Sequence, residues 1–216
     1  GLLADAGKQL PLTDKVIFSL EKESIPYWNK FLQGYYDASG ISSDSFDQAV
    51  SFSAEGDVGL TDNMIERGIG LQTAVTTSSY YFGFNMLDDI VGGYSDKAKK
   101  LRHAISIVMD YEEYISIFQN GRGVPAQGII PPGIFGHVAD EEGMNNVVYT
   151  WSNGLHRRTV VEANDLLNEA GYPKGIDPST GKPLVLYFDT MDSGPDSKAR
   201  LNWLRKQFNK LNIQLV

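Results

Sequence analysis

The last third of the chain carries the pattern that most limits the fold. Residues 184–188 are continuously apolar, as in parallel strands that are buried on both faces. A helix is predicted over 195–211, where leucine and phenylalanine recur on one face, and a further strand is predicted over 213–216. Strand, helix and strand in this order form a βαβ unit. The pattern therefore predicts an α/β fold.

The starts of several helices are marked by side chains that can accept hydrogen bonds from backbone N–H groups. Thr159 and Glu162 form a capping box ahead of a helix with the 3-4-3 apolar spacing of a buried stripe. Ser95 opens a helix that is apolar on one face and basic on the other. Asp110 and Glu113 form a D-x-x-E box that starts the next helix. These signals predict helices with well-defined first turns.

The first half of the chain contains further candidate strands. Residues 16–20 alternate between apolar and polar side chains, and a helix over 24–34 separates them from a strand over 35–38, which predicts a compact βαβ-like unit. β-Branched and aromatic residues are frequent in 71–76 and 79–85, so both segments are predicted strands. Together with the C-terminal unit, these elements predict a mixed sheet flanked by helices.

A long loop is predicted from Asn120 to about Asn153, and it is rich in proline and glycine up to residue 136. A loop of this length inside a compact domain is usually functional or wrapped over another surface. One hypothesis is therefore that residues 121–136 form an interaction surface.

Charge and composition exclude several classes of partner and site. The chain has 19 Lys and Arg against 27 Asp and Glu, a formal net charge of −8, so we expect no nucleic-acid partner. The basic cluster of Lys97, Lys99, Lys100 and Arg102 is explained by the polar face of its helix. Because there is no cysteine, disulfides, thiolate metal sites and a cysteine nucleophile are excluded. No apolar run approaches the roughly 20 residues that cross a bilayer.

Motifs for catalysis or cofactor binding are weak. Residues 121–126 spell G-x-G-x-x-A, but they follow a helix and enter a proline-rich loop, whereas a dinucleotide fingerprint follows a strand and opens a helix. His103, His137 and His156 have no partner at metal-ligand spacing, and no G-x-S-x-G elbow is present. Adjacent carboxylates diverge in space and do not form an acid–base couple. We expect no catalytic residue, no metal and no cofactor.

Aromatic and short polar residues gather near the ends of predicted strands. Ligands of α/β proteins bind at the carboxyl ends of strands, and the loop after Phe188 has that position. Two tyrosines in a strand also fit the ordinary alternative of cross-strand packing. The binding candidates from this pattern are Tyr80, Tyr81, Asn85, Asp189, Thr190 and Asp192.

Four segments carry a family resemblance. They are Phe84-Asn85, the helical stretch 98–113, the loop 120–132 that closes on two prolines, and the helix and turn over 163–175. In this order and spacing they resemble family 5 extracellular solute-binding proteins, the oligopeptide- and dipeptide-binding components of ABC importers. The resemblance runs from about residue 14 to residue 216.

The resemblance implies that residues 1–216 form a single α/β lobe of a two-lobe, class II periplasmic-binding-protein fold, as a fragment of a longer chain. Such lobes close on a peptide as a hinged trap. Ser79 lies in the segment that is similar to a strand near the hinge, and residues 188–193 are similar to the strand-end loop that faces the cleft. Asp189 departs from the family, whose members often have asparagine there.

The implied function is the capture of a peptide or another small solute for the permease subunits of an ABC importer. The resemblance also implies a monomeric, non-enzymatic protein that is periplasmic, or extracellular and tethered as a lipoprotein. Some family members bind nickel, haem, opines or sugars, so the ligand class stays open. A protein-interaction module and a hydrolase on an α/β fold are the alternatives. We expect the 216 residues alone to bind peptides poorly, because half of the implied cleft is absent.

Overall fold

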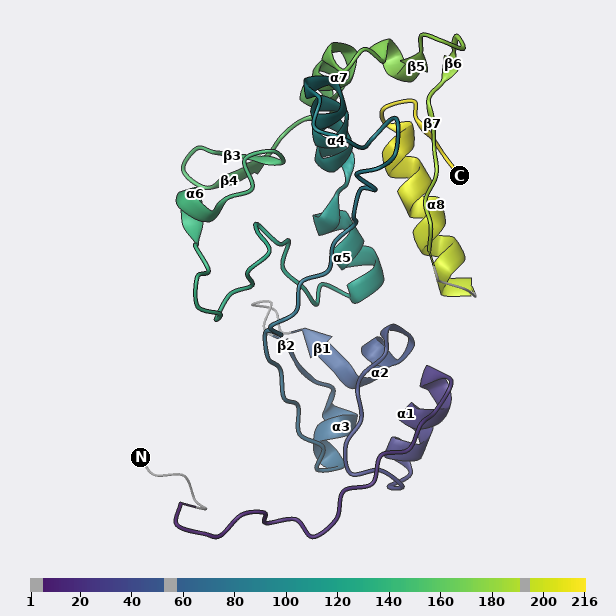
Figure 1. Cartoon of the computed structure of the whole chain (residues 1–216). Coiled ribbons are helices and arrows are strands. Elements are labelled where there is room, and N and C mark those ends of the chain that lie inside the picture. Colours follow the sequence, from purple (N-terminus) through teal and green to yellow (C-terminus); the bar gives the residue numbers. More distant parts are fainter. Residues whose placement is uncertain (1–5, 53–57, 191–194) are drawn as a thin grey trace. The chain divides into compact units, whose positions relative to one another are not determined.

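A computed structural model describes residues 6–52, 58–190 and 195–216 of the chain (Figure 1). The chain divides into two compact units, Gly1–Gln72 and Thr73–Val216, and each is described by itself. The expectation of a single lobe over 1–216 stays a prediction.

The first unit is small, and most of its regular structure is helical. Its core contains Trp28, Phe46, Ala49, Val50 and Met64, all buried. The Trp28 indole N–H donates to Gln48 Oε1 at 2.7 Å, so the buried ring has a partner for its polar edge. The elements are α1 (Ser24–Leu32), η1 (Ser43–Ser45), α2 (Phe46–Ala49), β1 (Val50–Phe52), β2 (Val58–Leu60) and α3 (Asp62–Glu66).

The predicted βαβ-like unit near the N-terminus is wrong, since only its helix forms. Residues 16–20 and 35–38 are not strands, and the side chains of Phe18 and Leu20 are 92% and 96% exposed. Alternation of apolar and polar residues favours a strand, but a strand also needs a neighbour for its backbone hydrogen bonds. The described part of this unit offers residues 16–20 no such neighbour.

The second unit contains most of the regular structure. Its elements are α4 (Asp96–Val108), α5 (Tyr111–Gln119), α6 (Asp140–Gly143), β3 (Tyr149–Trp151), β4 (Leu155–Arg157), α7 (Val160–Glu169), η2 (Pro173–Gly175), β5 (Ile176–Asp177), β6 (Lys182–Pro183), β7 (Val185–Leu186), α8 (Pro195–Asn209) and β8 (Gln214–Leu215). Figure 1 shows α4 beside α7, and α8 packs against β8. The loop predicted over 120–153 is therefore interrupted by α6 and by the start of the β3–β4 hairpin.

The C-terminal βαβ unit is confirmed. β7 and β8 pair in parallel with Val185 opposite Gln214, and α8 connects them. The Gln214 N–H donates to Leu184 O at 2.8 Å, and the Val216 N–H donates to Leu186 O at 3.0 Å. The expected burial of this strand on both faces is wrong: Leu184 and Leu186, which lie on the same face, are buried, whereas Tyr187 on the other face is 77% exposed.

Helices and short strands together confirm the α/β class, but the described residues contain no larger mixed sheet. They form four two-stranded sheets, of which β1–β2, β3–β4 and β5–β6 are antiparallel. The segments 71–76 and 79–85 are extended without ladder hydrogen bonds, so the two predicted strands are wrong here. Within the described ranges, no helix is long and apolar enough to cross a membrane.

The core of the second unit lies between α4, α7, α8 and the β7–β8 pair. Leu101 of α4 and Leu167 of α7 are fully buried, and Trp203 of α8 is 5% exposed. Leu184 and Ile213 complete the core from the strand side. Close packing of these apolar side chains is the main stabilising contribution in a unit of this size.

The basic side chains of α4 contact neighbouring residues of the same unit. Lys100 forms ion pairs with Asp96 at 2.8 Å and with Glu169 of α7 at 3.0 Å. The Lys97 ammonium lies 4.6 Å from the centre of the Tyr172 ring, and Arg102 donates to the carbonyl of Val91 at 2.6 Å. These contacts join α4 to its neighbours.

The predicted helix caps form. Ser95 Oγ accepts from Ala98 N at 3.2 Å, and Asp110 Oδ1 accepts from Glu113 N at 2.9 Å. At the start of α7 both halves of the capping box are present, since Glu162 N donates to Thr159 Oγ1 and Thr159 N donates to Glu162 Oε2. Each bond satisfies a backbone N–H that lacks a partner inside the helix.

Thr159→Ala is expected to lower the free energy of unfolding by about 1 kcal/mol at pH 7. Hydrogen bonds from the Thr159 backbone, the Thr159 hydroxyl and Arg158 lower the pKa of Glu162 below its ordinary value of 4.5. A carboxyl with a lowered pKa stabilises the fold above its unfolded pKa, and this contribution is lost as the pH falls through the folded pKa. The part of the lost unfolding free energy that depends on ionised Glu162 should therefore decrease as the pH falls below 4.5. Urea unfolding across pH 3–7 checks this, and a pH-independent loss would contradict it.

Candidate functional site

A small pocket lies at the carboxyl end of β7, where the sequence places a ligand site. Its volume is about 100 Å³. The lining combines aromatic and aliphatic residues with one threonine and one arginine, and it comes from α5, α8, the segment after β7 and the segment before α4. The lining residues are Phe82, Tyr114, Phe188, Thr190, Arg200, Leu201 and Leu204.

Aromatic contacts fix the walls of this β7-end pocket. The rings of Phe82 and Phe188 meet edge to face with centres 5.6 Å apart, and Phe82 also stacks on Tyr111 at 6.1 Å. Tyr114 of α5 meets Trp203 of α8 edge to face at 5.2 Å. Offset and edge-to-face pairs are the favoured arrangements of such rings. Four segments that are distant in sequence are thereby held around one apolar hollow.

A carboxylate ties together the two helices that flank the pocket. The Trp203 indole N–H and the Gln207 amide of α8 both donate to Glu113 Oε2 of α5, each at 2.8 Å. Hydrogen bonds to an ionised acceptor are stronger than neutral ones. The Glu113 contacts therefore hold α5 and α8 at a defined separation on either side of the hollow.

Tyr111, which stacks on Phe82 behind the pocket and does not itself line it, stays uncharged. Burial raises the pKa of Tyr111 to about 12, so its hydroxyl is protonated at physiological pH. Besides Tyr114, the polar residues that line the pocket are Thr190 and Arg200. This arrangement can bind an apolar group and orient a neighbouring polar group by hydrogen bonding. Over the described ranges, no group of three His, Asp or Glu could hold a metal ion.

Of the predicted site residues that the structure describes, only Thr190 lines the β7-end pocket. Asp189 is exposed beside it in the chain. Tyr80 and Tyr81 are 89% and 83% exposed, in the extended segment that leads to Phe82. The other three residues behave as follows: Ser79 is half-buried, Asn85 accepts from Leu87 N at 3.0 Å in a turn, and Asp192 lies outside the described residues.

Sequence reasoning missed most of the pocket lining. Phe82 directly follows Tyr80 and Tyr81, so the run of aromatic residues could have identified it as a further site residue. Leu201 and Leu204 belong to the apolar stripe of α8, whose pattern does not tell a pocket wall from ordinary core. Tyr114 and Arg200 carry no local signal, because their role depends on how α5 and α8 pack.

Comparison with known proteins gives one result. A family model described as bacterial extracellular solute-binding proteins, family 5 Middle, matches residues 5–216. A search of curated proteins returns no match.

Proposed function

The chain belongs to family 5 of the bacterial extracellular solute-binding proteins, and from this premise we propose that it captures peptides for an ABC importer. Membership gives the chain a solute-binding role in ABC transport, and it confirms the resemblance carried by the four sequence segments. The peptide ligand is the proposed step beyond this role.

The β7-end pocket is the observation that supports the proposal. Its rings can receive an apolar side chain of a peptide, and the Thr190 hydroxyl can bond a neighbouring backbone group. The pocket also has the position, after a parallel strand, at which α/β proteins bind ligands. We include the exposed Tyr80, Tyr81 and Asp189 in the proposed site as its outer part, with Ser79, Asn85 and Asp192 as residues of the same two segments.

The remaining parts of the proposal follow from the family. Extracellular solute-binding proteins act outside the cytoplasm and in association with transporter components. We propose a periplasmic or lipoprotein-tethered monomer that delivers its ligand to permease subunits, without enzymatic activity. We also propose that the chain contributes one lobe of a two-lobe, class II binding fold.

Phe188→Ala is expected to weaken peptide binding about tenfold, because it removes a ring that forms the pocket wall and supports Phe82. The measurement is calorimetric titration of the full-length native protein with a tripeptide library. Phe135→Ala is the matched control, since this ring is fully exposed and lies away from the pocket lining. Equal affinities of Phe188→Ala and the unaltered protein would contradict the proposed site.

A second candidate function uses the loop 121–136. Phe135 is 102% exposed and Ile129 is 89% exposed, and Gly133 and Gly136 flank Phe135 with φ angles of 84° and 91°. Exposed apolar side chains on a loop of this kind are typical of protein-interaction surfaces. If interaction is the main role, Phe135→Ala should reduce transport while Phe188→Ala leaves it unchanged. Peptide uptake by cells carrying each variant separates the two functions.

A further inference from the structure

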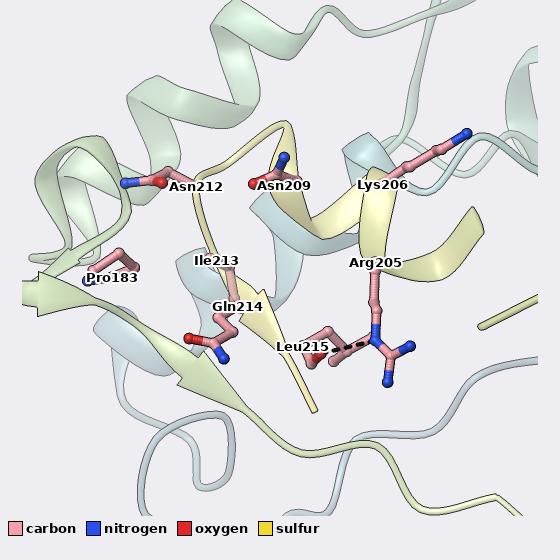
Figure 2. A pocket seen from close by; sticks show the side chains of 8 residues that line it. All are labelled: Pro183, Arg205, Lys206, Asn209, Asn212, Ile213, Gln214 and Leu215. Carbon is pink, nitrogen blue, oxygen red and sulfur yellow. Dashed lines mark hydrogen bonds between the residues drawn. The ribbon is translucent and has the colours of Figure 1, made fainter. Parts of the chain in front are cut away.

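The β7-end pocket offers apolar surface that a ligand can reach, whereas a larger hollow of the same unit does not. That hollow, of about 440 Å³, lies against α8 and β8 (Figure 2). In its lining, Ile213 and Leu215 are only 2% and 8% exposed, and Figure 2 shows the Lys206 side chain directed away from them. In the β7-end pocket, by contrast, Phe82 is 37% exposed and Phe188 is half-buried. An apolar group of a ligand can therefore contact these rings.

The exposure of the lining residues gives the β7-end pocket an apolar inner end and a polar mouth. Leu204 is buried, Leu201 and Phe188 are half-buried, and Thr190 is exposed. Leu204 therefore closes the inner end, and the threonine lies at the mouth. A side chain that enters exchanges water for aliphatic and aromatic surface, which is favourable for an apolar group and costly for a polar group without a partner.

Further rings support the walls and restrict how far the pocket can widen. Phe82 stacks on Tyr111 with ring centres 6.1 Å apart. The ring centre of Tyr114 lies 5.0 Å from that of Phe118 and 5.2 Å from that of Trp203. Close-packed side chains resist displacement, because a larger group forces their neighbours out of preferred rotamers. The volume of the pocket therefore limits the size of the group that can enter.

The volume of about 100 Å³ indicates which side chains of a peptide fit. A water molecule occupies about 30 Å³ in the liquid, so the pocket has room for roughly three groups of that size. An apolar cavity that binds benzene in another protein has a volume of about 150 Å³. The pocket therefore matches the branched aliphatic side chains of valine, leucine and isoleucine, whereas a phenyl or indole ring can enter only in part.

We propose that the β7-end pocket selects peptides that carry a branched aliphatic side chain, as in valine, leucine or isoleucine, at one position. This inference rests on the proposed function and adds a side-chain preference to it. The methyl groups of the ligand would contact Phe82, Phe188 and Leu201. Thr190 at the mouth would bond the adjoining backbone of the peptide.

The test compares alanine tripeptides in which one position carries leucine, asparagine or phenylalanine, with each position changed in turn. Their affinities for the full-length native protein are measured by calorimetry. At one position we expect leucine to bind about tenfold more tightly than asparagine, which is similar in size but polar, and more tightly than phenylalanine. Equal affinities, or tightest binding of the phenylalanine peptides, would overturn the inference while peptide capture stands. If no tripeptide binds, both the inference and the proposed function are overturned.

A variant with a larger pocket gives a readout that a general loss of stability does not imitate. Leu201→Ala removes part of the wall, so the phenylalanine peptide should gain at least about threefold in affinity relative to the leucine peptide. Leu166→Ala is the matched control, since Leu166 is also half-buried against the core but does not line the pocket, and it should leave this ratio unchanged. If Leu201→Ala does not fold, Leu201→Val should shift the ratio in the same direction by less. An unchanged ratio in the Leu201 variant, or an equal shift in Leu166→Ala, would overturn the inference.

Discussion

Gly175→Ala is expected to lower the free energy of unfolding of the second unit by about 3 kcal/mol or more. Gly175 ends η2 with a φ of +71°, and a Cβ at this position would lie 2.1 Å from Leu211 O and 2.9 Å from Asn212 O. These carbonyls belong to the turn between α8 and β8. A side chain here must displace that turn, because the atoms that it meets are backbone and cannot rotate aside.

Gly181→Ala is the control for this change. Its φ is +67°, close to that of Gly175, but no atom lies within 4 Å of the added Cβ. It should therefore cost only the strain of a left-handed alanine, about 1 kcal/mol. Urea unfolding of both variants, followed by circular dichroism, separates close packing from backbone strain. If the two losses are equal, the described contact between the η2 turn and the α8–β8 turn is wrong.

Leu167→Ala is expected to cost about 3–4 kcal/mol, because it leaves a cavity in the core between α4 and α7. Leu167 is fully buried, as is Leu101 on the facing helix. The removed methyl groups lose both their transfer free energy and their packing contacts. The loss is measured from the midpoint and slope of urea unfolding.

Val161→Ala on the same helix provides the comparison, since Val161 is 69% exposed. It should change the free energy of unfolding by less than about 0.5 kcal/mol. A loss below about 1 kcal/mol in Leu167→Ala would mean that α7 does not pack on α4 as described.

Local hydrogen-bonding signals made much of the second unit predictable. The Thr159 and Glu162 box, the Ser95 cap and the Asp110 cap are satisfied within three residues, so the sequence contains both partners of each bond. The strand at 184–188 was also recognisable from its continuous apolar run, although only the face with Leu184 and Leu186 is buried.

The strands predicted in the first half of the chain were wrong because a strand depends on a partner segment that the local sequence does not identify. A strand is stabilised by its neighbour, and no pattern within 16–20 or 79–85 specifies which segment that neighbour is. The exposed rings of Phe18 and Tyr80 show that β-propensity alone does not bury a side chain. The helix signals, by contrast, needed no partner from elsewhere in the chain.

The sequence singled out the chain segment after β7, but it did not identify most of the residues that line the pocket there. Thr190 follows the one strand whose identity was clear, so the strand-end rule singled it out, and it lines the β7-end pocket. Tyr114 and Arg200 line the β7-end pocket only because the Glu113 contacts hold α5 and α8 together. Contacts between residues about 90 positions apart have no signature in a single sequence.

The most direct test of the central claim is mass spectrometry of the ligand that is released from the full-length native protein. Capture at the β7-end pocket predicts that peptides co-purify with the unaltered protein and with Phe135→Ala, and that they are largely lost from Phe188→Ala. The absence of any bound solute, or equal amounts of peptide from the unaltered protein and Phe188→Ala, would contradict the account.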